Sequence, residues 1–147
     1  MAITYLNKRE NLDVLPLELR KVYELLEVDA GGVIIESFIT SNGFGFLGGR
    51  EQETELMLAL VHNKYIKKLT IRLIKFKAQR QGNCTQLMEL LIQHAHKEGY
   101  ELIELESVDS EGMEAFAKKN NFEQEVLHPV LQKAFGTKHS GNWIKKI

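Results

Sequence analysis

The sequence predicts an α/β (α+β) fold in which a mixed central sheet is flanked by helices. Three observations support this class. Short runs rich in β-branched and aromatic residues have the length of strands. Longer stretches carry apolar residues at helical spacing. In the second half of the chain strand-like and helix-like segments alternate, so part of the sheet is expected to be parallel.

In the first half we expect one helix and four strands. The helix begins near Leu15, and Leu19, Val22 and Leu26 continue its apolar face. Pro16 suits its first turn. The ranges are residues 15–28 for the helix and residues 3–6, 33–39, 56–61 and 67–76 for the strands.

Residues 44–50 are rich in glycine and are expected to form a loop. The apolar run at 56–61 is compatible with a buried strand or with part of a helix starting near Glu51, and we favour the strand. Residues 67–76 alternate, which assigns them to two faces. One face holds Leu69, Ile71 and Leu73, and the other holds Thr70, Arg72, Ile74 and Phe76.

In the second half the clearest helix spans residues 85–98, and Gly99 is a candidate for its C-terminal cap. A strand follows at 102–107, with Ile103 and Leu105 on one face. On the helix at 85–98, the apolar face is formed by Leu87, Leu91 and Ala95.

Ser110 can cap the next helix, which should end at Asn120 and Asn121 because Asn tolerates the left-handed conformation. Phe122 would then fold back against the helix. The inward residues of the helix are Met113, Phe116 and Ala117, and two further strands are expected at 123–127 and 142–147.

Length and composition limit the function classes. The chain has 147 residues, 44% hydrophobic and 27% charged, enough for a sizeable core in one domain over residues 1–147. The net charge of −1 argues against a nucleic-acid partner. No acidic residue follows Glu125, and this basic end is either a solvated face or a local attraction for an anion.

The cellular setting is expected to be cytoplasmic. Cys84 is the one cysteine, so an internal disulfide is excluded. No run approaches the roughly 20 apolar residues of a membrane span, and residues 1–9 lack the apolar segment of a secretory signal. We therefore expect a soluble protein that does not contact a membrane.

The segment Gln79-Arg80-Gln81-Gly82-Asn83-Cys84 lies between a predicted strand and a predicted helix. Such a loop lets backbone N–H groups converge on an anion at a helix N-terminus, where the helix dipole also favours negative charge. Gly82 leaves room for a phosphate, and Cys84 is small. The alternative is a plain strand-to-helix turn that needs one glycine.

From Leu69 to Phe122 the sequence resembles the core of the GNAT superfamily of acyl-CoA-dependent N-acyltransferases. The family's loop has Arg or Gln, two residues, Gly, one residue, and Gly or Ala; this chain has Gln79, Gly82 and Cys84. The family's later helix commonly ends Phe-Tyr-x-x-x-Gly-Phe, where this chain has Phe116 to Phe122, with Asn121 in place of the glycine.

The resemblance implies acetyl-CoA as co-substrate. Its pantetheine arm would lie in a gap where the strands at 67–76 and 102–107, the family's fourth and fifth, splay apart. The arm would pair with exposed backbone of the first of these strands, and the diphosphate would bind loop amides from Arg80 onward. The expected cofactor-binding residues are Leu73, Ile74, Lys75, Gln79, Arg80, Gln81, Gly82, Asn83, Cys84, Thr85 and Ser110.

The chain departs from the family at Ala117, which occupies the position where many members carry a tyrosine that protonates the leaving thiolate. The attacking amine also needs a base, and Glu106 is our candidate. The alternatives are that Glu104 pairs with Arg72 on the neighbouring strand and that Glu106 is solvated.

The histidines, Cys84 and Trp143 give weaker indications of function than the loop and Glu106. The five histidines lack ligand spacing, so no metal site is expected. Cys84 at a helix N-terminus is either a nucleophile or, as we prefer, a small packing residue. Trp143 is expected in the core or an interface.

Three functions are compatible with these patterns. The first is an N-acetyltransferase acting on a small-molecule or protein amine by direct attack, and a homodimer is compatible with it. The second is a non-catalytic GNAT-fold module that binds CoA or acyl-CoA or another protein. The third is an α/β domain that binds another phosphate, although the Gly-Lys-Ser/Thr ending of a P-loop is missing.

Overall fold

The computed structural model describes residues 4–5, 15–40, 42–62, 65–77 and 82–147. Within these residues eight strands form one sheet in the order β1-β2-β3-β4-β5-β6-β8-β7. The parallel pair is β5 and β6, and the other neighbours are antiparallel, so the mixed sheet is confirmed. The elements are β1 (Thr4–Tyr5), α1 (Leu17–Asp29), β2 (Ile34–Thr40), β3 (Gly43–Gly48), β4 (Thr54–His62), β5 (Lys67–Lys75), α2 (Asn83–Glu98), β6 (Leu102–Leu105), α3 (Glu111–Lys119), β7 (Glu123–Val126), α4 (Pro129–Phe135) and β8 (His139–Lys146).

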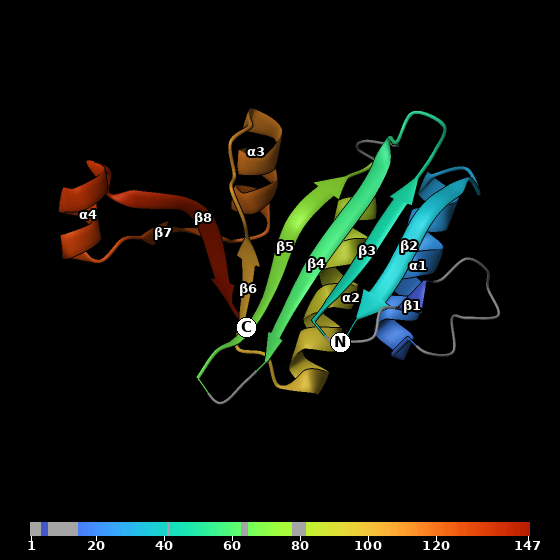
Figure 1. Ribbon diagram of the computed structural model, residues 1–147, viewed down its shortest axis with the longest axis horizontal. Helices are drawn as coiled ribbons and strands as arrows, with labels where there is room; N and C mark the ends of the chain where they lie inside the picture. The colour runs from blue at the N-terminus through green and yellow to red at the C-terminus, as the bar shows by residue number, and fades with distance from the viewer. Residues whose placement is uncertain (1–3, 6–14, 41, 63–64, 78–81) are drawn as a thin grey trace.

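Helices α1 and α2 pack against each other on one face of the sheet, behind β2–β5 in Figure 1. The opposite face of these strands carries none of the described helices, and we call it the open face. The predicted apolar positions of both helices are buried in the core, and Tyr23 of α1 meets Phe46 edge to face at 5.6 Å. None of the helices in the described part of the chain has the length and apolar character of a transmembrane span.

The loop expected at residues 44–50 is wrong, because most of this stretch is β3, a central strand. Phe44 and Phe46 point into the core, while Gly43 and Gly45 occupy positions that face the other way. A Cβ on Gly45 would lie 2.1 Å from the Phe38 ring, and one on Gly43 would lie 2.8 Å from the Leu58 carbonyl oxygen. The glycines thus permit close packing within the sheet.

The alternation predicted for residues 67–76 fails at Arg72. The register shows an irregularity here: Ile71 pairs with Leu58, while Leu73 pairs with its neighbour Met57. The extra residue shifts the following side chains to the other face. Leu73 is therefore 43% exposed, and Ile74 packs against the core in its place.

The second half follows the prediction closely. The side chain of Ser110 accepts a hydrogen bond from the Met113 N–H at 3.2 Å, and α3 ends before Asn121, whose φ of 62° is left-handed. Phe122 folds back with its N–H donating to the Ala117 carbonyl at 2.9 Å. The strand expected at 102–107 ends sooner, at Leu105, and the one expected at 142–147 begins sooner, at His139.

Helix α4 was not predicted, although its signals are present in the sequence. His128 caps it through a bond from the Val130 N–H, Pro129 opens it, and Gly136 ends it with a φ of 69°. No residue of α4 is buried. A helix that is not packed against the core lacks the apolar periodicity from which helices are recognised.

Candidate functional site

The parallel strands β5 and β6 pair only over part of β5. Lys68 to Ile71 pair with Leu102 to Leu105, and the Glu106 N–H then donates to the Ile71 carbonyl at 3.1 Å. Strand β5 continues to Lys75, whereas the chain after β6 turns towards α3 (Figure 1). The two strands therefore part, as expected from the splay predicted between these segments.

A groove of about 620 Å³ lies beyond the point where the strands part. Its walls come from the end of β5, the start of α2 and one side of α3. The lining residues are Ile74, Lys75, Phe76, Gly82, Asn83, Cys84, Thr85, Ser110, Gly112, Met113, Ala115, Phe116, Lys119 and Asn120.

Many of the predicted cofactor-binding residues come together in this groove. Leu73 does not line it, and Gln79, Arg80 and Gln81 lie outside the described residues. The predicted residues that line the groove are Ile74, Lys75, Gly82, Asn83, Cys84, Thr85 and Ser110.

Helix α2 presents its N-terminus to the groove. Gly82 is the N-cap residue with a φ of 77°, a conformation that glycine adopts without steric cost. In the described part of the chain no side chain caps this terminus. The first N–H groups of a helix have no intrahelical acceptor, and together with the dipole they favour an anion.

The thiol of Cys84 is unsuited to act as a nucleophile. Burial raises the pKa of the Cys84 thiol, the Lys119 ammonium opposes this rise, and the Asp29 carboxylate adds to it. A thiol with a raised pKa stays protonated at neutral pH, so little thiolate is present. This favours the packing role expected for Cys84.

Asp29 is a site residue that the sequence analysis missed. Its buried carboxylate accepts hydrogen bonds from the Thr54 hydroxyl at 2.5 Å, the Lys77 N–H at 2.8 Å and the Asn83 side-chain amide at 2.8 Å. One signal was available: Asp29 ends α1, where the helix dipole disfavours an anion.

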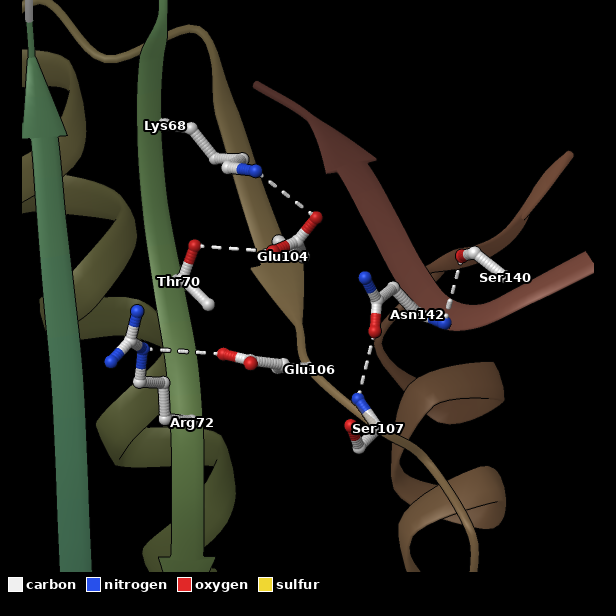
Figure 2. Close-up of polar contacts among 8 residues, drawn as sticks. All are labelled: Lys68, Thr70, Arg72, Glu104, Glu106, Ser107, Ser140 and Asn142. Atoms are coloured by element: carbon white, nitrogen blue, oxygen red, sulfur yellow. Dashed lines mark hydrogen bonds and ion pairs between the residues drawn. The ribbon is translucent and has the colours of Figure 1, made fainter. Parts of the chain in front are cut away.

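On the open face two acidic residues bridge β5 and the chain of β6 (Figure 2). Glu104 is buried and contacts the Lys68 ammonium at 3.3 Å and the Thr70 hydroxyl at 3.2 Å. Arg72 pairs instead with Glu106 at 3.2 Å, so the alternative in which Glu104 pairs with Arg72 is wrong. The Glu106 side chain is 41% exposed.

A second hollow, of about 520 Å³, lies over the open face of β2–β5. Its small residues Gly43 and Ala59 leave space between larger neighbours, and Arg72 connects it to Glu106. The lining residues are Phe38, Thr40, Asn42, Gly43, Met57, Leu58, Ala59, Leu60, Val61 and Arg72.

Ala117 is fully buried, and its neighbour Phe116 lines the groove instead. The groove-lining side chains that carry a hydroxyl are Thr85 and Ser110 within the described residues. The described residues also contain no group of three or more His, Cys, Asp or Glu placed to hold a metal ion.

No protein-family model matches the chain, and no curated protein matches its sequence. Its structure is similar to Tetrahymena GCN5, with a TM-score of 0.52 and 14% identity over 100% of this chain and 96% of that one. A GNAT family acetyltransferase from Elizabethkingia anophelis with acetyl-CoA bound gives a TM-score of 0.47 and 14% identity over 99% and 97%. A probable GNAT-family acetyltransferase from Chromobacterium violaceum gives 0.47 and 14%, and the match spans 74% of this chain but 60% of that one.

Of these three, the match to Tetrahymena GCN5 has a TM-score above 0.5, and at 14% identity it shows the fold alone. The mixed sheet and the parted parallel strands agree with the fold that the sequence resemblance implies. The chain therefore has a GNAT-like fold, which confirms the resemblance at the level of fold.

Proposed function

We propose that the chain is a GNAT-type N-acetyltransferase that transfers the acetyl group of acetyl-CoA to an amine by direct attack. The groove beside the parted strands carries this proposal. It combines a helix N-terminus that no described side chain caps, and that attracts phosphate, with the end of β5, which pairs with β4 but extends beyond its pairing with β6. Most of the residues expected from the loop motif line it.

The residues of the groove fit the chemistry of the coenzyme. The first turn of α2 offers amides to the diphosphate, and the ammonium group of Lys119, which acts on the groove residue Cys84, adds positive charge there. Met113 and Phe116 give an apolar surface for the pantetheine arm. The backbone of residues 73–75 would hydrogen-bond the amides of that arm.

In the proposed reaction the amine nitrogen attacks the thioester carbonyl carbon, the C–S bond breaks and CoA leaves as its thiolate. A β5 backbone amide near Ile74 or Lys75 would stabilise the negative charge on the carbonyl oxygen. A lysine-like amine has a pKa near ~10.4, so freeing it at pH 7 costs about 4–5 kcal/mol. Glu106 would accept the proton.

The hollow on the open face is the proposed route for the acceptor. Glu106 lies where β5 and β6 part, and its partner Arg72 lines the hollow. An amine entering from this face would meet the carboxylate of Glu106 on the way to the thioester. The acceptor is a small molecule or a protein, and we propose a cytoplasmic location for the reaction.

A non-catalytic acyl-CoA-binding module is the second candidate, and Ala117 favours it. A buried methyl group cannot protonate the leaving thiolate. A thiol has a pKa of roughly 8.5, however, so thiolate is a tolerable leaving group near neutral pH. Loss of one general acid typically lowers the rate by about 10²–10⁴-fold, which predicts slow turnover rather than none.

Thermal unfolding tests the binding site. CoA and acetyl-CoA should raise the melting temperature and ATP should not, because a ligand that binds only the folded state stabilises it. The variant Gly82→Glu should abolish the CoA-induced shift by placing a carboxylate at the helix N-terminus.

Gly136→Glu is the matched control, since Gly136 also has a positive φ, meets open space and ends a helix away from the groove. It should lose stability through the same backbone strain and keep the shift. An equal shift in wild type and Gly82→Glu would mean that CoA binds elsewhere. Thiol release from acetyl-CoA across a panel of amines then separates the enzyme from the module.

A further inference from the structure

The carboxylate of Asp29 joins three elements that the chain order keeps apart. Thr54 begins β4, Lys77 follows β5, and Asn83 is the first residue of α2. One oxygen accepts from the Thr54 hydroxyl and the Lys77 N–H, and the other accepts from the Asn83 side-chain amide. Asp29 itself is 7% exposed.

Burying the Asp29 carboxylate at this place is unfavourable in free energy unless its oxygens accept hydrogen bonds. A buried carboxylate loses its hydration, and at the C-terminus of α1 it also faces the negative end of the helix dipole. The three donors offset the lost hydration, as they do for buried charges generally. A hydroxyl or an amide at position 29 would not accept all three hydrogen bonds as strongly.

Two of the three donors belong to the ends of the two elements that bring the proposed diphosphate site together. Lys77 follows the end of β5, and Asn83 is the first residue of α2, directly after Gly82. Both are fixed to the same side chain, so Asp29 sets the separation between the end of β5 and the first turn of α2. The third donor, Thr54, is in β4 and does not line the groove.

We propose that Asp29 is a positioning residue for coenzyme binding, which holds the end of β5 and the N-terminus of α2 at the separation that the diphosphate requires. This inference rests on the proposed function. Asp29 acts through Lys77 and Asn83 rather than by contact, since it does not line the groove. A binding site held in place before the ligand arrives does not lose affinity to ordering of the loop ends.

The test compares variants that remove different hydrogen bonds of the cluster. In Asp29→Asn the new side chain keeps one acceptor oxygen, but its NH₂ group is itself a donor and faces donors of the cluster in place of the second oxygen. The dissociation constant for CoA should therefore rise about tenfold or more. Thr54→Val removes the Thr54 bond and leaves those to Lys77 and Asn83. It should lower the melting temperature while the dissociation constant for CoA changes less than about twofold.

Asn83→Ala supplies an independent arm if Asp29→Asn does not fold. It should weaken CoA binding, and the double variant should be no weaker than the worse single variant because both remove the same contact. Isothermal titration calorimetry gives the dissociation constants, and thermal unfolding gives the stabilities. A purely structural role would make CoA affinity follow melting temperature across all variants.

Two results would overturn the inference. In the first, Asp29→Asn or Asn83→Ala binds CoA as tightly as wild type. In the second, Thr54→Val weakens binding as much as they do. If wild type itself bound no CoA, the proposed function would fail, and the inference would fail with it.

Discussion

Among single residues, Glu106 is the one proposed to act directly in catalysis, as the base that accepts the proton of the amine. It lies where β5 and β6 part and pairs with Arg72, which lines the hollow over the open face. Glu106→Gln keeps the shape of the side chain and removes the proton acceptor. We expect kcat to fall by about 10²–10⁴-fold while KM for acetyl-CoA stays unchanged, because Glu106 does not line the coenzyme groove.

Steady-state kinetics with a productive amine measures this effect. Glu89→Gln, an exposed change on α2, is the control and should retain wild-type kcat. If Glu106→Gln turns over at the wild-type rate, another group or water accepts the proton.

How far a residue's role could be predicted from sequence depends on where its partners are. The capping role of Ser110 and the left-handed turn at Asn121 were predicted because the interactions are within a few residues. The roles of Asp29 and Arg72 were not, because their partners lie 25 to 54 residues away for Asp29 and in the segment after β6 for Arg72. Such contacts follow from the fold and not from local spacing.

Among the elements, β3 depends most on the absence of side chains. A Cβ on Gly43 would lie 2.8 Å from the backbone oxygen of Leu58, which cannot move without disturbing β4. Gly43→Ala should therefore destabilise the fold by about 1–3 kcal/mol, as overpacking usually does. Gly112→Ala in α3 meets nothing within 4 Å and should instead stabilise it by about 0.5–1 kcal/mol. Urea unfolding of both variants measures the difference, and equal effects would mean that the Gly43 contact relaxes freely.

The errors at element level share a cause. β3 looked like a loop because glycines on one face of a strand were interpreted as turn residues. Leu73 was assigned to the same face as Leu69 and Ile71 because alternation cannot show the extra residue at Arg72. In both places the structure depends on what the neighbouring strand presents, and a single sequence does not contain that information. Segments with strong helical periodicity, such as α2, were predicted almost to the residue.

At the scale of the whole molecule, one apolar cluster extends from α1 across the sheet to Trp143 in β8. The strands on either side of the coenzyme groove meet through the short parallel pairing of β5 with β6 and through Glu104. A continuous core predicts that the two sides unfold together. Far-UV circular dichroism, which follows all elements, and the fluorescence of the single tryptophan, Trp143, should then give one urea midpoint.

Glu104→Ala tests more directly whether the two sides of the groove unfold together. It leaves Thr70 and Lys68 of β5 without the acceptor that β6 supplies. It should destabilise the protein by about 1–3 kcal/mol and shift both midpoints equally. Glu101→Gln removes an exposed pair with Lys67 at 3.8 Å, and such pairs contribute about 1 kcal/mol at most. A shift of the Trp143 signal alone in Glu104→Ala would show that β6, β8 and β7 unfold separately. A coenzyme bound at the proposed site would then have to hold two independent units together.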